Sequence, residues 1–167
     1  MAQDTWNRKT NQSPQDEQES IEQDLQMVES SQTCVLLVED ESLIAEIICE
    51  ALEEHGFCVH SVSDASEALA HLSTGSRVDV LFTDINLPGE LDGAALAERM
   101  RGMLPDLPVI YASGRWGRLD ELGNLPLSIT LQKPYSPARA CAAVEVLMSK
   151  RLAGLEGRYM PRRVLAS

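Results

Sequence analysis

The chain has 167 residues, of which 44% are hydrophobic and 4% aromatic, and its formal net charge is -12. This length allows one domain of ordinary size with tails, around a core that is mainly aliphatic. The acidic charge argues against a nucleic-acid binder, because such a protein needs a basic face to neutralise phosphates. No apolar run of about 18 residues and no signal peptide is present, so we expect a soluble, cytoplasmic protein without a membrane segment.

The two ends of the chain differ in composition from its middle. Residues 1–31 are rich in Gln, Ser, Asp and Glu and hold few large apolar residues, so they are predicted to form a disordered acidic extension. Residues 153–167 are predicted to form a basic flexible tail. Between them, residues 33–152 are expected to form the folded domain.

Short apolar runs alternate with amphipathic helical patterns along this middle part. The runs are β-prone and bounded by Gly, Pro or acidic residues, as buried strands are. The predicted strands cover residues 34–38, 57–62, 78–84, 108–112 and 128–132, and the predicted helices cover residues 42–55, 64–72, 91–103 and 136–152. The crossover between Gly114 and Pro126 is rich in glycine, so any helix there is expected to be short.

Alternating strands and helices predict parallel strands with right-handed crossovers and helices on both faces. We therefore predict an α/β fold with a doubly wound, five-stranded parallel sheet. If this sheet has the flavodoxin-like order 2-1-3-4-5, Asp40 and Asp84 meet at its switch point, between the first and third strands. The carboxyl ends of all strands then lie at one edge of the sheet. The residues there are Glu39 and Asp40 after the first strand, Asp84 after the third, Ser113 after the fourth and Lys133 after the fifth.

The acidic residues at this edge predict a metal site. A single Asp at a strand end can serve only the next turn, but carboxylates packed together repel one another unless a cation joins them. Oxygen ligands suit a hard divalent ion, most naturally Mg²⁺. Beside such an ion, the Asp84 carboxylate can act as a nucleophile on a phosphoryl group and form an acyl phosphate. Lys133 can then place a positive charge on the phosphoryl oxygens, and Ser113 can donate a hydroxyl.

The cysteines and histidines are not predicted to form sites. The cysteines lie in apolar segments without a CxxC motif, so we expect buried reduced thiols. The histidines lack the spacing of metal ligands. These residues are Cys34, Cys49, Cys58 and Cys141, and His55, His60 and His71.

The sequence from Thr33 to Leu152 resembles the receiver domain of the two-component response regulator family. The resemblance rests on motifs that follow one another in order and spacing. They are the segment Val35–Glu41, the run Asp84–Gly89 followed by Asp92-Gly93, then Ala112-Ser113-Gly114, and Lys133-Pro134-Tyr135. The form of these motifs and the absence of an output domain resemble the stand-alone, single-domain receivers of α-proteobacteria.

This resemblance implies a role for each site residue. Asp84 matches the phosphoacceptor, and Asp40 and Asp84 match the side-chain ligands of Mg²⁺. Glu39 would support the metal through water, and the main-chain carbonyl of Asn86 would complete the protein ligands.

The phosphoryl-binding residues follow the family, and two features depart from it. Ser113 matches the switch hydroxyl, and Lys133 matches the lysine that pairs with the phosphoryl group. Thr130 occupies the position of the usual aromatic switch, so signalling through an aromatic side chain is not expected. The loop from Pro88 to Gly93 is one residue longer than the commonest receiver loop, but neither departure removes a ligand.

The resemblance implies a phosphoacceptor module in which Asp84 takes a phosphoryl group from a histidine kinase or histidine phosphotransfer protein. Phosphorylation would control binding to an unidentified protein target, or the domain would act as a phosphate sink for a kinase. Catalysis is expected to be limited to self-phosphorylation from small donors and autodephosphorylation.

An aspartate-based Mg²⁺ phosphohydrolase is disfavoured, because its usual second Asp is here Asn86. A receiver-like fold kept only for protein contacts would have lost site residues, and none is missing. The sequence leaves the oligomeric state open.

Overall fold

The computed structural model describes residues 32–114 and 119–159 of the chain. The predicted acidic extension, residues 1–31, lies outside the described residues, as do residues 160–167 of the predicted tail. Within the described part, no helix is long and apolar enough to cross a membrane.

The strands form one parallel sheet in the order β2-β1-β3-β4-β5, as predicted. They are β1 (Cys34–Val38), β2 (Cys58–Val62), β3 (Val80–Asp84), β4 (Val109–Ser113) and β5 (Ser128–Gln132). The register pairs Asp84 with Ala112 and Ser113 with Gln132, so the last residues of the three strands lie side by side. The sheet therefore brings its carboxyl ends to one edge.

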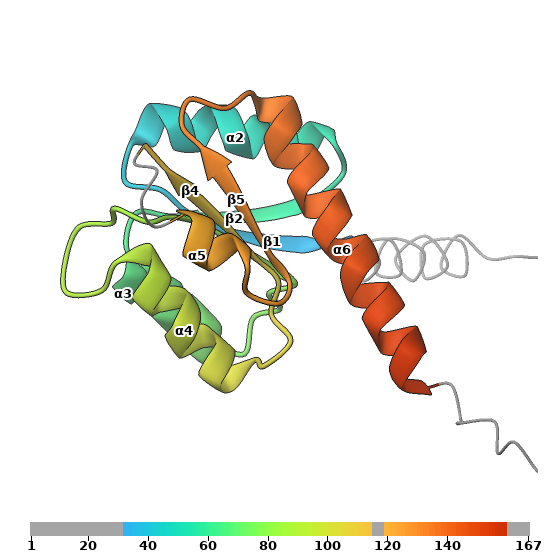
Figure 1. Ribbon diagram of the computed structural model, residues 1–167. Helices are drawn as coiled ribbons and strands as arrows, with labels where there is room; N and C mark the ends of the chain where they lie inside the picture. The colour runs from blue at the N-terminus through green and yellow to red at the C-terminus, as the bar shows by residue number, and fades with distance from the viewer. Residues whose placement is uncertain (1–31, 115–118, 160–167) are drawn as a thin grey trace, which may run out of the picture. The chain divides into compact units, whose positions relative to one another are not determined.

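Helices cover both faces of this sheet (Figure 1). They are α2 (Ser42–Glu54), α3 (Ala65–Ser73), α4 (Gly93–Met103), the short α5 (Leu119–Gly123) and α6 (Pro137–Tyr159). The side chains of α3 and α4 pack on one face, and those of α2 and α6 pack on the other. As expected for a glycine-rich crossover, α5 has only five residues.

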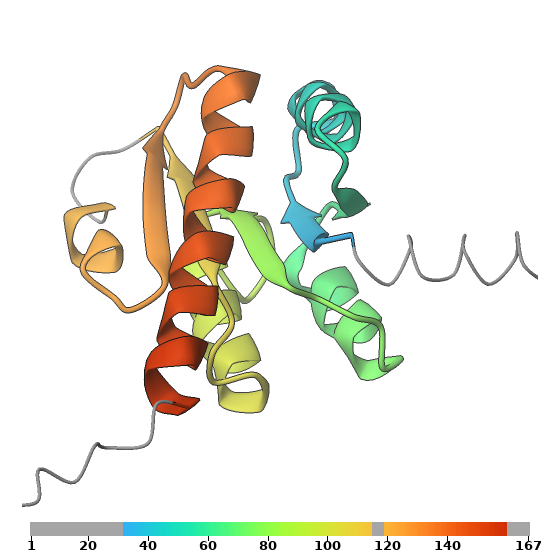
Figure 2. The same ribbon diagram turned by 90° about the vertical axis from the view of Figure 1, so that its right-hand side faces the viewer.

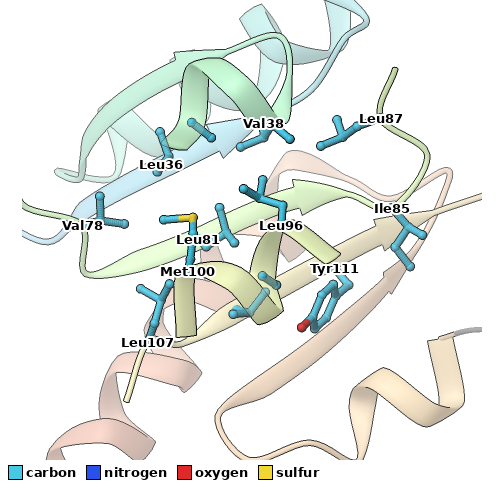
Figure 3. Close-up of a cluster of buried hydrophobic side chains, with 14 residues drawn as sticks. Leu36, Val38, Val78, Leu81, Ile85, Leu87, Leu96, Met100, Leu107 and Tyr111 are labelled. Atoms are coloured by element: carbon cyan, nitrogen blue, oxygen red, sulfur yellow. The ribbon is translucent and has the colours of Figure 1, made fainter. Parts of the chain in front are cut away.

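Two aliphatic cores follow from alternation along the strands. Leu36 and Leu81 point toward α3 and α4, whereas Val35 and Val80, one residue earlier, point toward α2 and α6. Figure 3 shows the first core, in which Met100 of α4 packs among strand side chains. Each fully buried Leu or Val contributes about 1.5–3 kcal/mol relative to exposure, so these layers hold the carboxyl edge rigidly.

Local sequence signals set where the helices begin. The Asp64 carboxylate accepts hydrogen bonds from the amides of Ser66 and Glu67, at 2.8 and 2.9 Å. Glu67 in turn accepts from the Ser63 amide at 2.9 Å, so the pair resembles a capping box in which the Glu bonds to the residue before the N-cap. At α6, the Ser136 hydroxyl accepts from the Arg139 amide at 3.3 Å, as expected for an N-cap.

Helix α6 is longer than predicted. It continues to Tyr159 and runs past the sheet (Figures 1 and 2), so residues 153–159 of the predicted flexible tail are helical. No proline interrupts the sequence before Pro161. In addition, Arg151 donates to the Asp79 carbonyl at 3.2 Å and so fastens the helix to the start of β3.

The cysteine and histidine predictions hold only in part. None of the four cysteines forms a disulfide, but Cys141 alone is buried and Cys58 is exposed. Cys58 begins β2, which is an edge strand, so no further strand of the sheet covers the outer side of β2. The rings of His60 and His71 stack with centroids 3.8 Å apart, a contact between β2 and α3 that their sequence spacing did not indicate.

Candidate functional site

The predicted site residues gather at the carboxyl edge of the sheet. Glu39 and Asp40 follow β1, Asp84 ends β3, Ser113 ends β4 and Lys133 follows β5. The parallel topology alone explains why segments so distant in sequence meet.

An acidic cluster forms the centre of this edge. Glu39, Asp40 and Asp84 each offer a carboxylate oxygen, and these atoms lie within 4.8 Å of one another. Glu39 and Asp84 are 4% and 6% exposed, whereas Asp40 is open to solvent. Buried carboxylates this close repel one another, and an all-oxygen donor set suits a hard divalent cation such as Mg²⁺. The cluster could therefore hold a metal ion that solvent can reach.

Lys133 is the cation that this structure places against the two buried carboxylates. Its ammonium donates to Asp84 Oδ2 at 2.5 Å and to Glu39 Oε2 at 2.8 Å. Burial acts to lower the pKa of Lys133, but the hydrogen bonds to Asp84 and Glu39 outweigh it and raise the pKa well above its usual value. Burial raises the pKa of Glu39, and Lys133 opposes that rise. The ammonium thus stays charged beside Asp84.

The Asp84 side chain is held in place by the loop that follows it. The Asn86 amide donates to Asp84 Oδ1 at 2.8 Å, and the Ile85 amide donates to the Ala112 carbonyl at 2.9 Å. Gly93 begins α4 against this strand end, and a Cβ at Gly93 would lie only 1.9 Å from the Asp84 carbonyl oxygen. Glycine is therefore required there, which explains the Asp92-Gly93 motif. The Asn86 carbonyl as a metal ligand stays a prediction.

Ser113 and Thr130 lie on β4 and β5, of which β4 pairs with the strand that carries Asp84. Ser113 is 2% exposed and ends β4, one residue after the Ala112 that pairs with Asp84. Thr130 is half-buried on β5, and a Cβ at Gly123 would lie 3.3 Å from its hydroxyl oxygen. The small Thr130 therefore allows α5 to pack close to β5, in a place where an aromatic side chain would need more room.

An apolar groove beside Lys133 was not anticipated from the sequence. It has a volume of about 380 Å³ and is lined by Ile44, Ile47, Ile48, Lys133, Pro134, Tyr135 and Pro137. Ile47 is 54% exposed and its neighbour Leu43 is 73% exposed, which is unusual for large apolar residues. Burial raises the pKa of Tyr135 to about 12, and its ring lies 6.0 Å from that of Phe82. The apolar residues Leu43 and Ile47 of α2 are the signal in the sequence that could have indicated this surface.

Comparison with known proteins gives a consistent family likeness. A family model described as the response regulator receiver domain matches residues 35–145. The C4-dicarboxylate transport transcriptional regulatory protein DctD of Rhizobium meliloti is 29% identical over 83% of this chain and 30% of its own length. The transcriptional regulatory protein CreB of Escherichia coli is 30% identical over 70% of this chain and 51% of its own length. The chain thus spans about half or less of these relatives.

Two solved receiver structures give the same likeness over nearly their whole length. A response regulator receiver protein from Sinorhizobium medicae is 30% identical, with a TM-score of 0.67, and the match covers 72% of this chain and 98% of that one. The receiver domain of the Francisella response regulator 1452 is 29% identical, with a TM-score of 0.63, over 71% of this chain and 98% of that one.

Proposed function

Because the chain belongs to the response regulator receiver domain family, we propose that Asp84 accepts a phosphoryl group in a two-component phosphorelay and that its phosphorylation controls protein binding. The observation that carries this proposal is the position of Asp84, buried between the Lys133 ammonium and two further carboxylates. A purely structural aspartate would have donors that match its own charge, whereas Asp84 shares the Lys133 ammonium with Glu39 and lies beside a third carboxylate, Asp40.

The residues of the chain divide the chemistry among them. One Asp84 carboxylate oxygen attacks the phosphorus while the P–N bond to a donor histidine breaks and its electron pair returns to the imidazole. The Asn86 amide fixes the orientation of the carboxylate through Oδ1. Lys133 would move from Asp84 Oδ2 to the phosphoryl oxygens, whose negative charge it stabilises. Ser113 would donate its hydroxyl to the same group.

The acidic cluster supports a role for Mg²⁺ in this step. Glu39, Asp40 and Asp84 are the side chains that would hold it, since their oxygens converge and the exposed Asp40 leaves the site open. When bound, Mg²⁺ would supply positive charge for the phosphoryl oxygens that Lys133 alone cannot provide. Glu39 shares Lys133 with Asp84, so it would hold the ammonium near the site while Asp84 reacts.

The apolar groove on α2 is the surface that we propose for the phosphodonor. It adjoins Lys133 directly, and a histidine-bearing helix with apolar neighbours could bury Leu43 and Ile47 there. The donor would be a histidine kinase or histidine phosphotransfer protein in the cytoplasm. Changing Ile47 to Glu should then slow transfer from a phosphorylated histidine protein that labels the parent, while labelling by acetyl phosphate stays unchanged. Equal slowing of both reactions would contradict this docking surface.

Incubation with acetyl phosphate and Mg²⁺ tests the central proposal. The protein should gain one phosphoryl group by intact mass, and the product should be stable to acid and labile to base. Asp84→Asn should not be labelled, whereas Asp79→Asn, which changes the other buried aspartate of the same segment, should be labelled like the parent. Equal labelling of Asp84→Asn and the parent would show that the acceptor is wrong.

The consequence of phosphorylation distinguishes two versions of this function. An adaptor would bind its protein target differently when the site is filled, whereas a phosphate sink would only accept and lose phosphoryl groups. A pull-down with and without beryllofluoride separates them, because an adaptor should retain a partner in one of the two conditions only.

A further inference from the structure

Gln132, the last residue of β5, connects the two segments that carry Ser113 and Lys133. In the register of the sheet it lies opposite Ser113, and it directly precedes Lys133. Its side-chain Nε2 donates to the Gly114 carbonyl at 3.1 Å and to the Lys133 carbonyl at 3.2 Å. The Gln132 carboxamide therefore links Gly114, the residue that follows Ser113, to Lys133.

This side chain is not explained by packing alone. Its Oε1 atom is buried and makes no hydrogen bond within the described part of the chain. A buried acceptor without a partner destabilises a fold, so an apolar side chain of similar length would avoid that penalty. What Gln132 adds in return is the pair of bonds from Nε2.

These bonds restrain the movement that phosphorylation requires. Under the proposed function, the Ser113 hydroxyl moves toward a phosphoryl group on Asp84, and the Gly114 carbonyl, as part of the next residue of the chain, would move with it. The Lys133 amide already donates to the Ser113 carbonyl at 2.8 Å, so Gln132 is a second link between the same two segments. Stretching a hydrogen bond of 3.1 Å weakens it steeply.

We propose that Gln132 is a positioning residue that holds Ser113 in its unphosphorylated place and sets how readily the site rearranges around a phosphoryl group. This inference rests on the proposed function of Asp84. It predicts that loss of the two Nε2 bonds favours the phosphoryl-bound arrangement, because the restraint acts only on the other state.

The test is the affinity for beryllofluoride in Gln132→Met and Gln132→Glu. Methionine keeps the length but cannot donate, and the Glu carboxylate would face two carbonyl oxygens and repel them. Both variants should bind beryllofluoride more tightly than the parent, by about fivefold for Met, the equivalent of one net hydrogen bond. Affinity can be measured by ¹⁹F NMR or calorimetry at saturating Mg²⁺. Affinity for Mg²⁺ alone should stay unchanged, which a general structural defect would not allow.

Asn124→Ala is the matched control. The Asn124 carboxamide also donates to a backbone carbonyl in the crossover between β4 and β5. Its acceptor is the Asp120 carbonyl at 2.9 Å, and it has no bond to the end of β4. It should bind beryllofluoride like the parent, with folding of every variant checked by circular dichroism.

The possible results distinguish a failure of the Gln132 inference from a failure of the proposed function of Asp84, on which it rests. Parent-like or weaker beryllofluoride binding by folded Gln132 variants would overturn the positioning role while leaving Asp84 as the acceptor. Parallel changes in Mg²⁺ and beryllofluoride affinity would also overturn it. If the folded parent itself fails to bind beryllofluoride with Mg²⁺, the proposed function fails and this inference with it.

Discussion

Asp79 lies just before strand β3, and Asp84 is the last residue of that strand. The two aspartates differ in what surrounds them. Both are buried, at 8% and 6% exposed. Asp79 Oδ2 accepts from the Cys34 amide and from Arg77, each at 2.9 Å, and Arg151 lies 3.7 Å from Oδ1. Asp84 instead shares its charged donor, Lys133, with Glu39, and Asp40 adds a third carboxylate beside them. Burial alone therefore does not identify a functional acid, whereas the balance of charge around it does.

The two environments have opposite consequences for the fold. The donors around Asp79 join the start of β1, the segment before β3 and the far part of α6, so this carboxylate stabilises three elements at once. At the other end of the strand, Lys133 is shared between Glu39 and Asp84, and Asp40 adds a third acid. Under the proposed function, that end would bind a cation and a phosphoryl group at the expense of stability.

The largest effect on stability is expected at Asp79. Changing Asp79 to Ala should lower the free energy of unfolding by about 3 kcal/mol, because the Cys34 amide, Arg77 and Arg151 all lose this buried acceptor. Urea unfolding measures this change, and Arg77→Ala is the control. Since the Arg77 side chain is 49% exposed, its removal should cost less than about 1 kcal/mol. A smaller effect at Asp79 than at Arg77 would contradict a structural role for the aspartate.

Metal binding tests the same comparison at the other end of β3, where Asp84 lies. With Mg²⁺ at a hundredfold excess over its dissociation constant, the free energy of unfolding should rise by about 2.7 kcal/mol, and removal by EDTA should reverse the rise. Asp40→Asn should need more Mg²⁺ for the same gain, while Asp79→Ala should need no more than the parent. An unchanged Mg²⁺ requirement in Asp40→Asn would remove Asp40 from the ligand set.

The smallest effect is expected for Asp84→Asn without metal. This change removes one carboxylate from a repelling group, and Lys133 keeps Glu39 as its partner. The free energy of unfolding should therefore stay constant or rise by up to about 1 kcal/mol. Thermal or urea unfolding in EDTA measures it. A loss as large as that of Asp79→Ala would mean that the two aspartates do not differ as described.

The site could be predicted from the sequence because a parallel sheet places every strand end at one edge. Once five strands were recognised from apolar runs, Asp84, Asp40 and Lys133 were expected at the same edge, whatever their separation in the chain. They are neighbours there because the strand order is 2-1-3-4-5, which was expected for a flavodoxin-like sheet and which the structure confirms. It also placed the second strand at the edge, so the exposure of Cys58 could have been anticipated.

Other features depend on side-chain contacts that no sequence pattern carries. The Arg151 bond to Asp79 spans 72 positions, and neither residue belongs to a motif. A polar residue such as Gln132 at a strand end resembles any solvent-facing residue until its Nε2 is seen to reach two carbonyls. The helical path to Tyr159 was missed for a related reason. The basic residues from Lys150 onward suggested a tail, whereas the contact of Arg151 with Asp79 holds this part of the helix.

The most direct test of the central claim is to trap the acceptor chemically. After reaction with acetyl phosphate and Mg²⁺, borohydride reduces an aspartyl phosphate to homoserine, and peptide mass spectrometry locates the changed residue. We predict homoserine at position 84, its loss when EDTA replaces Mg²⁺, and unmodified Asp79 and Asp40. Homoserine at Asp79 or Asp40, or none at position 84 in a protein that has gained a phosphoryl group, would contradict the account.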